Sequence, residues 1–352
     1  MGRPTIRDLS VAAGVSVATV NRVLAGSGKV GPATMQRVLE AAQSVGFYGL
    51  GAVQQRVASA QPQHRLGVIV QTPHRLFSQA IEKNLETVAE EFSQAGDGEA
   101  LLRFEHLDDL SPESVAARML AVGETVDAIG VVAAEHPIVT DAIDRLAARG
   151  VPVIALVSPL SARAHVGFVG LDGWKVGRMA AWVFGHLCKA APGKLGILVG
   201  THRYRCHDQN ESGFRSYFRE HANERITLLE PQSTFESDAI AREVTEKLLR
   251  SHADLAGLYV SGGGIGGALA ALRDSGRSGQ VVTVGYDLLD STRAGLLDGS
   301  LTVVISHPFR RFAHETVVAL VQAKASKAGK SGSAAGGLSV IVPFEIYTRE
   351  NI

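Results

Sequence analysis

The chain has few cysteines and no long apolar run. Among its 352 residues only Cys188 and Cys206 carry thiols, too few for a disulfide framework or a thiolate metal cluster, so we expect free thiols in a reducing compartment. No apolar run approaches the roughly 18 residues that a membrane span needs. The N-terminus, MGRPTIRDLS, lacks the apolar segment of a signal peptide. These absences predict a cytoplasmic protein with no membrane partner.

Motifs of catalysis and metal binding are equally scarce. The sequence contains no G-x-S-x-G nucleophile turn, no P-loop lysine and no H-E-x-x-H zinc motif. The stretch HRYRCHD brings together His202, Cys206, His207 and Asp208, but adjacent side chains such as those of Cys206 and His207 do not easily converge on one ion. We therefore predict a protein that is not an enzyme and has no catalytic residue, metal or cofactor.

The chain also lacks a net charge, but its charges are unevenly distributed. It has 35 basic and 35 acidic residues. Residues 1–60 contain six basic residues against two acidic ones, Asp8 and Glu40; the basic ones are Arg3, Arg7, Arg22, Lys29, Arg37 and Arg56. A small basic head on a mildly acidic body predicts that the head meets a polyanion.

Three short helices are expected in this head. Thr5 can cap the first helix, with Asp8 three residues later as an acidic variant of the capping box. Ser16 can cap a second helix over residues 17–25, and a third follows over residues 32–45. The short connection between the first two helices is typical of a helix-turn-helix.

The second helix has an apolar side and a side of small and polar residues. Its apolar side faces the other two helices and consists of Val20, Val23 and Leu24; its outward side consists of Val17, Ala18, Asn21 and Arg22. Small residues let a helix enter the major groove, arginine can bind guanine in a bidentate manner, and asparagine can bind adenine or a phosphate. This pattern predicts a DNA-reading helix; the alternative is a face that is merely solvated.

The stretch TIRDLSVAAGVSVATVNRVLAGSGKV resembles the N-terminus of the lactose-repressor and galactose-repressor family of transcription regulators. The resemblance implies that the protein binds double-stranded operator DNA. It implies base contacts by Val17, Ala18 and Arg22, and backbone contacts by Thr5, Ser16, Thr19 and Asn21. Because one recognition helix reads only a few base pairs, we expect a homodimer on a near-palindromic site.

Residues 49–63 match the hinge and linker of that family, whose relatives wedge a leucine into the minor groove. The nearest residues here are Arg56 and Val57, which we expect to contact DNA. An arginine suits a narrow minor groove at an A·T-rich step. Whether this hinge kinks DNA stays open.

Residues 64–352 alternate between apolar runs and amphipathic stretches, which predicts a doubly wound parallel sheet, and the length suffices for two such lobes. The expected strands are LGVIV (66–70), AIGVV (128–132), VPVIALV (151–157), LGILVG (195–200), LAGLYVS (255–261), VVTVGYD (281–287) and LTVVIS (301–306). Their order resembles periplasmic sugar-binding proteins of the ribose-binding type. The expected architecture is an all-α helix-turn-helix head, residues 1–48, plus a two-lobed α/β sensor and dimerisation domain. The resemblance implies three crossings between the lobes, near residues 162–168, 298–306 and 322–340.

Ligands of such folds bind at the carboxyl ends of strands, in the cleft between the lobes. We expect the effector to be bound by His74, Phe77, Ser158, Asp208, Asn210, Ser261, Tyr286, Asp287, Ser306 and His307. The resemblance implies that Asp287 binds ligand hydroxyls; the alternative is a cap on the helix that follows it.

The sequence differs from its sugar-binding relatives at two places that are relevant to the chemistry of the ligand. An Asp-Arg pair of the relatives is replaced by Val157 and Ser158, and an arginine by Asn210. Losing paired charge lowers the capacity for bidentate recognition of a carboxylate. Arg203 and Arg205 could compensate or could be solvated loop residues. We therefore expect a small neutral sugar or polyol.

A glycine-rich turn supports an alternative function. GGGIGG, residues 262–267, satisfies the G-x-G-x-x-G pattern, follows an apolar strand and opens a helix, as in nucleotide-binding enzymes. It occurs late in the chain, and the glycines also suit close approach of the backbone to a cleft ligand. A third possibility, a solute-binding protein of a transporter, is opposed by the DNA-binding head. The sequence thus favours a ligand-responsive transcriptional regulator, a repressor of a carbohydrate or polyol catabolic operon.

Overall fold

The computed structural model describes residues 3–27, 30–60, 62–72, 75–95, 98–188, 192–325 and 338–352. The chain divides into two compact units, residues 1–64 with 89–101 and residues 65–88 with 102–352. Among the described residues no single helix is both long and apolar enough to cross a membrane; helices α1 (Ile6–Ala12) and α2 (Val17–Ala25) satisfy that test only as a pair, bent by 110°.

The head is formed by four helices: α1 (Ile6–Ala12), α2 (Val17–Ala25), α3 (Pro32–Ser44) and α4 (Leu50–Ala60). Thr5 caps α1 through a capping box, in which its hydroxyl accepts from the amide of Asp8 while the carboxylate of Asp8 accepts from the amide of Thr5. Ser16 caps α2 by accepting from the amide of Thr19 at 3.1 Å. The first two helices therefore begin where their caps indicated, and the third begins at Pro32, as expected.

The fourth helix occupies the segment expected to be a hinge. Val53 of α4 is fully buried in the same apolar core as Val20 and Val23 of α2. That core consists of Leu9, Ala13, Val20, Val23, Val38, Ala41, Ala42, Phe47 and Val53. Residues beyond position 48 thus contribute to the packing of the head, because α4 presents an apolar side chain to it.

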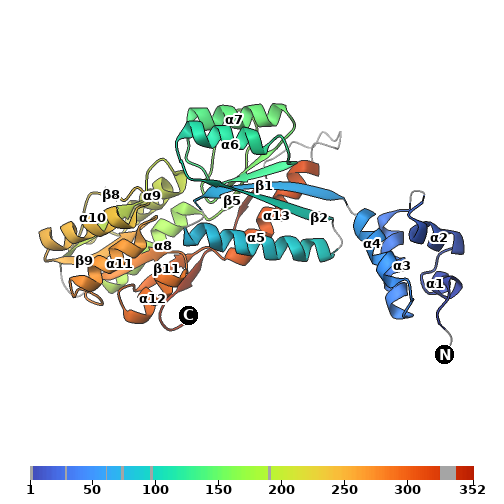
Figure 1. Cartoon of the computed structure of the whole chain (residues 1–352). Coiled ribbons are helices and arrows are strands. Elements are labelled where there is room, and N and C mark those ends of the chain that lie inside the picture. Colours follow the sequence, from blue (N-terminus) through green and yellow to red (C-terminus); the bar gives the residue numbers. More distant parts are fainter. Residues whose placement is uncertain are drawn as a thin grey trace. The chain divides into compact units, whose positions relative to one another are not determined.

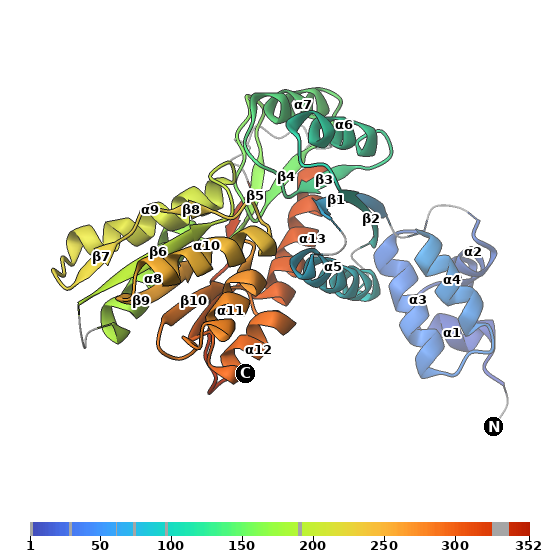
Figure 2. The same cartoon turned by 60° about the vertical axis from the view of Figure 1, so that its left-hand side comes forward.

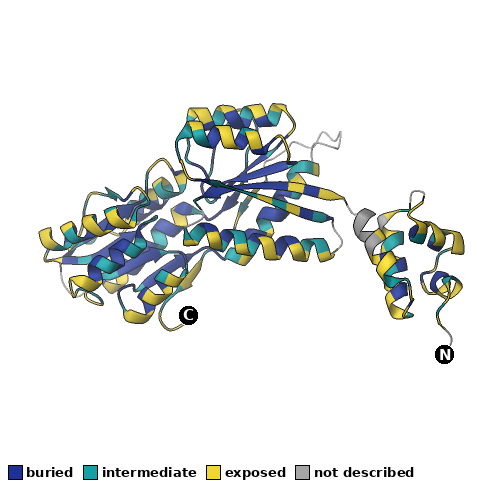
Figure 3. Cartoon of the chain, in the orientation of Figure 1, coloured by how far each residue is buried: buried dark blue, intermediate teal, exposed yellow. Residues whose placement is uncertain are grey.

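The N-terminal lobe is a six-stranded sheet in the order β12-β5-β4-β3-β1-β2 (Figure 1). Its strands are β1 (Gln63–Gln71), β2 (Glu99–Leu107), β3 (Ala128–Val131), β4 (Val153–Leu156), β5 (Gly167–Gly170) and β12 (Ser339–Ile341). Helices α6 and α7 lie over one face, and α5 and α13 lie over the other; these are α5 (Leu76–Ala95), α6 (Pro112–Val122), α7 (Pro137–Ala148) and α13 (Phe309–Ala325). The first three apolar runs predicted from the sequence are the central strands β1, β3 and β4 of this sheet, which are largely buried (Figure 3).

The C-terminal lobe is a second sheet, in the order β13-β11-β10-β9-β6-β7 with β8 also paired to β6. Its strands are β6 (Gly193–Val199), β7 (Ile226–Leu228), β8 (Gln232–Ser233), β9 (Leu255–Val260), β10 (Val282–Tyr286), β11 (Val303–Ser306) and β13 (Glu345–Tyr347). Its helices are α8 (Gly173–Leu187), α9 (Arg205–Glu220), α10 (Asp238–Ser251), α11 (Ile265–Asp274) and α12 (Asp290–Asp298). Figure 2 shows α10, α11 and α12 side by side along this lobe. The expected fold class, a helical head with two doubly wound parallel lobes, is confirmed.

The crossings between the lobes lie later in the chain than we expected. β5 still pairs with β4 in the first sheet, so the first crossing follows residue 170 instead of spanning 162–168. β11 belongs to the second sheet, and α13 packs on the first, so the second crossing follows residue 306. β12 pairs with β5 and β13 with β11, which places the third crossing at residues 342–344. The sequence expectation was wrong here because β5 and β12 are short and carry little apolar signal.

Candidate functional site

The outward face of α2 carries the residues expected to read DNA. Val17 is 43% exposed, and Ala18, Asn21 and Arg22 are exposed as well. The side chain of Arg22 lies along its own helix, where Nε donates to the carbonyl oxygen of Ala18 at 3.3 Å. Small exposed residues around one arginine leave this face free for close approach to base edges.

A hollow beside α2 adds three residues that sequence reasoning did not assign to DNA. Arg3 and Arg7 contribute positive charge, and Tyr48, which is 73% exposed, contributes an aromatic ring. The hollow is lined by Arg3, Pro4, Thr5, Ile6, Arg7, Val17, Asn21 and Tyr48. Basic side chains flanking a recognition helix are suited to phosphates. The excess of basic residues in the head was the signal that pointed to Arg3 and Arg7.

Arg56 lies against the C-terminal end of α2. Gly26 closes α2 in the left-handed conformation at φ +62, and a Cβ placed on Gly26 would lie 2.7 Å from Cζ of Arg56. A cation near the C-terminus of a helix complements the helix dipole. Arg56 is therefore placed to stabilise α2, while the side chain of Val57 lies outside the described part of the chain.

A cavity of about 130 Å³ opens between the two lobes of the body, at the carboxyl ends of strands from both sheets. A volume of that size holds roughly four water molecules at about 30 Å³ each, which suits a small polyol. Five of the residues expected to bind the effector line it: Phe77, Asn210, Tyr286, Asp287 and His307.

The remaining expected residues are placed differently. Ser158, Ser261 and Ser306 are buried but do not line the cavity. Asp208 is exposed outside it. His74 lies outside the described residues. Arg203 and Arg205 are exposed, and Tyr204 between them lines the cavity instead.

Asp287 and His307 form a buried pair on one wall of the cavity. Oδ1 of Asp287 accepts from the amide of His307 and pairs with its Nδ1, both at 2.8 Å. With Nδ1 donating, Nε2 of His307 is an acceptor, and it is buried without a hydrogen-bond partner among the described residues. A ligand hydroxyl would satisfy it.

The side chain of Asp287 does not cap helix α12, the alternative role considered for it. The N-cap position of α12 is Leu289, while the carboxylate of Asp287 is bonded to His307. The carbonyl oxygen of Asp287 accepts from the hydroxyl of Thr292 at 2.7 Å. The side chain of Asp287 is thus directed to the cavity and not to the amides of α12.

Backbone strain is concentrated around the cavity. Four described residues other than glycine have positive φ, and three of them line it: Val157 at +67, Glu236 at +63 and Asp287 at +60. A β-branched residue such as Val157 is rare in this conformation. Such conformations persist where the surroundings impose them, and they cluster at binding sites.

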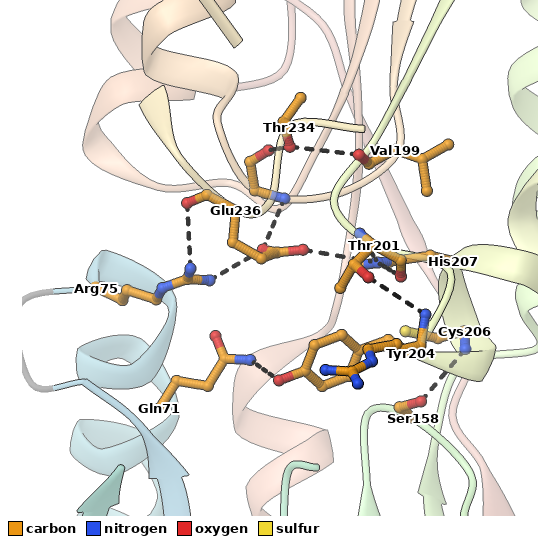
Figure 4. Close-up of polar contacts among 12 residues, drawn as sticks. Gln71, Arg75, Ser158, Val199, Thr201, Tyr204, Cys206, His207, Thr234 and Glu236 are labelled. Atoms are coloured by element: carbon orange, nitrogen blue, oxygen red, sulfur yellow. Dashed lines mark hydrogen bonds and ion pairs between the residues drawn. The ribbon is translucent and has the colours of Figure 1, made fainter. Parts of the chain in front are cut away.

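Several lining residues were missed by sequence reasoning, among them Gln71, Arg75, Cys206, His207 and Glu236. Arg75 Nη1 donates to Glu236 Oε2 at 2.9 Å, and Gln71 donates to the hydroxyl of Tyr204 (Figure 4). Glu236 follows β8, a strand of two residues that has no apolar run, so no sequence signal directed attention to it.

Charge at the cavity is balanced within the protein. Burial disfavours the charged form of His207, but Cys206 and Glu236 favour it more, so the pKa of His207 is raised to about 9. Nδ1 of His207 lies 3.6 Å from Oε1 of Glu236. Burial and the neighbouring Glu236 raise the pKa of Tyr204 to about 12, which keeps its hydroxyl protonated. Among the described residues, no group of three or more His, Cys, Asp or Glu side chains could hold a metal ion.

The glycine-rich turn packs against carboxylates of the protein itself. The amide of Gly263 donates to Glu236 at 3.0 Å and that of Gly267 to Asp238 at 3.2 Å. A Cβ on Gly267 would lie 1.8 Å from the carbonyl oxygen of Asp238. These glycines thus permit α10 and α11 to pack closely, and two amides of the turn already donate to carboxylates of the protein, which occupy the place of a pyrophosphate.

The chain matches two protein families. Residues 66–328 match the periplasmic binding protein domain, and residues 5–49 match the bacterial regulatory proteins of the lacI family. The chain is also similar over 65 residues to the maltose regulon regulatory protein MalI of Escherichia coli K12, with 46% identity. That similarity covers 18% of this chain and 18% of MalI.

Solved structures share the fold of the body. The glucose-galactose binding protein GanP of Geobacillus stearothermophilus has a TM-score of 0.71 at 14% identity, covering 83% of this chain and 99% of GanP. A periplasmic solute-binding protein of Actinobacillus succinogenes with bound D-allose has a TM-score of 0.70 at 20% identity, covering 83% of this chain and 99% of its own.

The two family matches are to a binding domain and to regulatory proteins, and neither is to an enzyme. The chain belongs to the periplasmic binding protein domain family, and its head is the DNA-binding domain of the lacI family of bacterial regulatory proteins.

Proposed function

We propose that the protein is a ligand-responsive transcriptional regulator, a cytoplasmic homodimer that represses a carbohydrate or polyol catabolic operon. The observation that carries this proposal is the presence, in one chain, of an exposed recognition helix and a two-lobed body with a lined cavity. A change in the lobes on binding the effector alters the spacing of the two hinges in the dimer, and with it the affinity for the operator.

The effector is a small neutral sugar or polyol. Support comes from the charged groups that line the cavity: Arg75 is paired with Glu236, and the carboxylate of Asp287 is hydrogen-bonded to Nδ1 of His307. A carboxylate ligand would meet no unpaired cation among these residues, whereas hydroxyls can donate to Nε2 of His307. The D-allose bound to the solute-binding protein of Actinobacillus succinogenes is consistent with this class of ligand.

Effector and operator must be linked thermodynamically. If a sugar lowers operator affinity by some factor, bound operator must lower sugar affinity by the same factor, which we expect to lie at roughly 5- to 150-fold. Isothermal titration of sugar into protein with and without operator measures this factor. A sugar that binds equally well in both titrations would contradict the proposal.

Arg22 is expected to discriminate between sequences. Replacing it with alanine should reduce the preference for operator over unrelated DNA by about 1–3 kcal/mol, because a bidentate base contact is lost while phosphate contacts remain. Binding to both DNAs is measured by fluorescence anisotropy at one salt concentration. An equal loss on both would instead make Arg22 a phosphate contact.

A nucleotide-binding enzyme is the competing function. The carboxylates of Glu236 and Asp238 at the start of α11 argue against a pyrophosphate there. NAD and NADP should therefore give no saturable change in the fluorescence of Trp174 and Trp182.

A further inference from the structure

The backbone of the turn between β8 and α10 is strained, although the strain does not bury the apolar side chain of Phe235. Phe235 and Glu236 have φ of +50 and +63, and the amide of Ser237 donates to the carbonyl oxygen of Thr234 at 2.9 Å. Consecutive left-handed residues with a Cβ are unfavourable. Phe235 is 67% exposed, whereas the side chain of Glu236 is only 9% exposed. The turn therefore serves to place Glu236.

The carboxylate of Glu236 is held by donors typical of an anion receptor. Oε2 accepts from Nη1 of Arg75 at 2.9 Å and from the amide of Gly263 at 3.0 Å. Nη2 of Arg75 also donates to the main-chain oxygen of Glu236 at 3.1 Å, and the imidazole of His207 faces Oε1 (Figure 4).

Two glycines make room for this carboxylate. A Cβ on Gly200 would lie 1.6 Å from Oε1 of Glu236, and a Cβ on Gly263 would lie 2.2 Å from Oε2. Any side chain at either position would displace the carboxylate. The surrounding backbone is therefore shaped to its volume, as it would be around a bound anion.

The arrangement also spans the cleft. Arg75 follows β1 of the N-terminal lobe, and Glu236 follows β8 of the C-terminal lobe. Two amides bond across the same cleft: Cys206 donates to Oγ of Ser158 at 3.3 Å, and Glu135 donates to the carbonyl oxygen of Arg203 at 3.0 Å. Protein groups therefore bond the two lobes to each other directly.

We propose that Glu236 is a built-in carboxylate ligand of the cleft: it fills an anion position made by Arg75, Gly263 and His207, and so holds the lobes together before any effector binds. It follows that acidic effectors are excluded, because their position is taken. This consequence for effectors rests on the proposed function, whereas the anion position itself is tested without DNA or sugar.

The test removes the carboxylate of Glu236 from the anion position and then offers acetate as a replacement. Glu236→Gly removes the carboxylate, and glycine tolerates φ of +63 without strain. In the full-length protein, hydrogen exchange at the amides of Glu135 and Cys206 should accelerate by on the order of tenfold or more, because their acceptors lie in the opposite lobe. Sodium acetate should reverse this in a saturable manner, and acetamide should not.

Matched variants sharpen the result. The amide of Val132, bonded within one lobe to Ile69, should exchange at the wild-type rate throughout. Glu246→Gln, which loses ion pairs confined to α10, should leave all three amides unchanged. Arg75→Gln combined with Glu236→Gly should abolish the rescue by acetate.

Each contrary outcome overturns the inference. Wild-type exchange rates in Glu236→Gly would show that the carboxylate does not hold the lobes. Rescue by acetamide, or rescue that survives Arg75→Gln, would show that no anion position exists. If Glu236→Gly fails to fold, Glu236→Gln replaces it, because glutamine keeps the shape of the side chain without its charge. In that variant the amides of Glu135 and Cys206 should exchange fast, and acetate should not slow them.

Discussion

Asp287→Asn is expected to weaken sugar binding about 10- to 100-fold, which corresponds to roughly 1.5–3 kcal/mol. The substitution keeps the size of the side chain, and asparagine tolerates the φ of +60 found at this position. It removes the charge that strengthens the bonds to His307 and to any ligand hydroxyl. The sugar to use is the one that raises the melting temperature of the wild-type protein most in a neutral sugar panel, and calorimetry measures its affinity.

Asp208→Asn is the matched control, because Asp208 is exposed and does not line the cavity. It should leave sugar affinity at the wild-type value. If both variants lost the same amount of sugar affinity, any negative charge near the cleft would have the same effect. The pair of Asp287 and His307 would then have no special role.

Gly177→Ala is expected to destabilise the protein by about 3 kcal/mol or more. Alanine normally favours a helix over glycine by about 1 kcal/mol. Here a Cβ would lie 1.9 Å from the carbonyl oxygen of Asn210 and 2.7 Å from the amide nitrogen of Phe214, so α8 and α9 must separate. The free-energy cost of overpacking against the backbone of α9 exceeds the gain from the higher helix propensity of alanine. Urea unfolding followed by circular dichroism measures the loss.

Gly185→Ala tests whether the cause is this contact. Gly185 lies in the same helix, and the atoms nearest to its added Cβ belong to the side chain of Tyr217, at 3.3 Å or more. We expect unchanged stability or a gain of up to about 1 kcal/mol. If both variants lost stability equally, a general intolerance of α8 would replace the close contact as the explanation.

Helix caps and continuous apolar runs made much of the fold predictable. Thr5 and Ser16 marked the starts of α1 and α2, because their hydroxyls replace missing backbone acceptors at a helix end. Buried parallel strands such as β1 and β9 were visible as apolar runs. The crossings were misplaced because β5 and β12 have three or four residues each, and register is set by tertiary pairing.

The cavity was only partly predictable. Residues that directly follow an apolar strand, such as Asp287 and His307, could be placed at the cleft, because parallel strands end at one edge. Arg75 and Glu236 could not, since each lies in a loop whose path the sequence does not reveal. Asp208 was misjudged as a neighbour of the cavity because it shares its helix with Asn210, whose buried face it does not share.

The central claim, that this protein regulates genes through operator DNA, is tested most directly by selecting genomic fragments of the source organism with the purified full-length protein and sequencing those retained. The account predicts enrichment of an inverted repeat upstream of a catabolic operon for a sugar or polyol, reduced when the sugar that stabilises the protein is added. Retention of fragments without a shared repeat would contradict it.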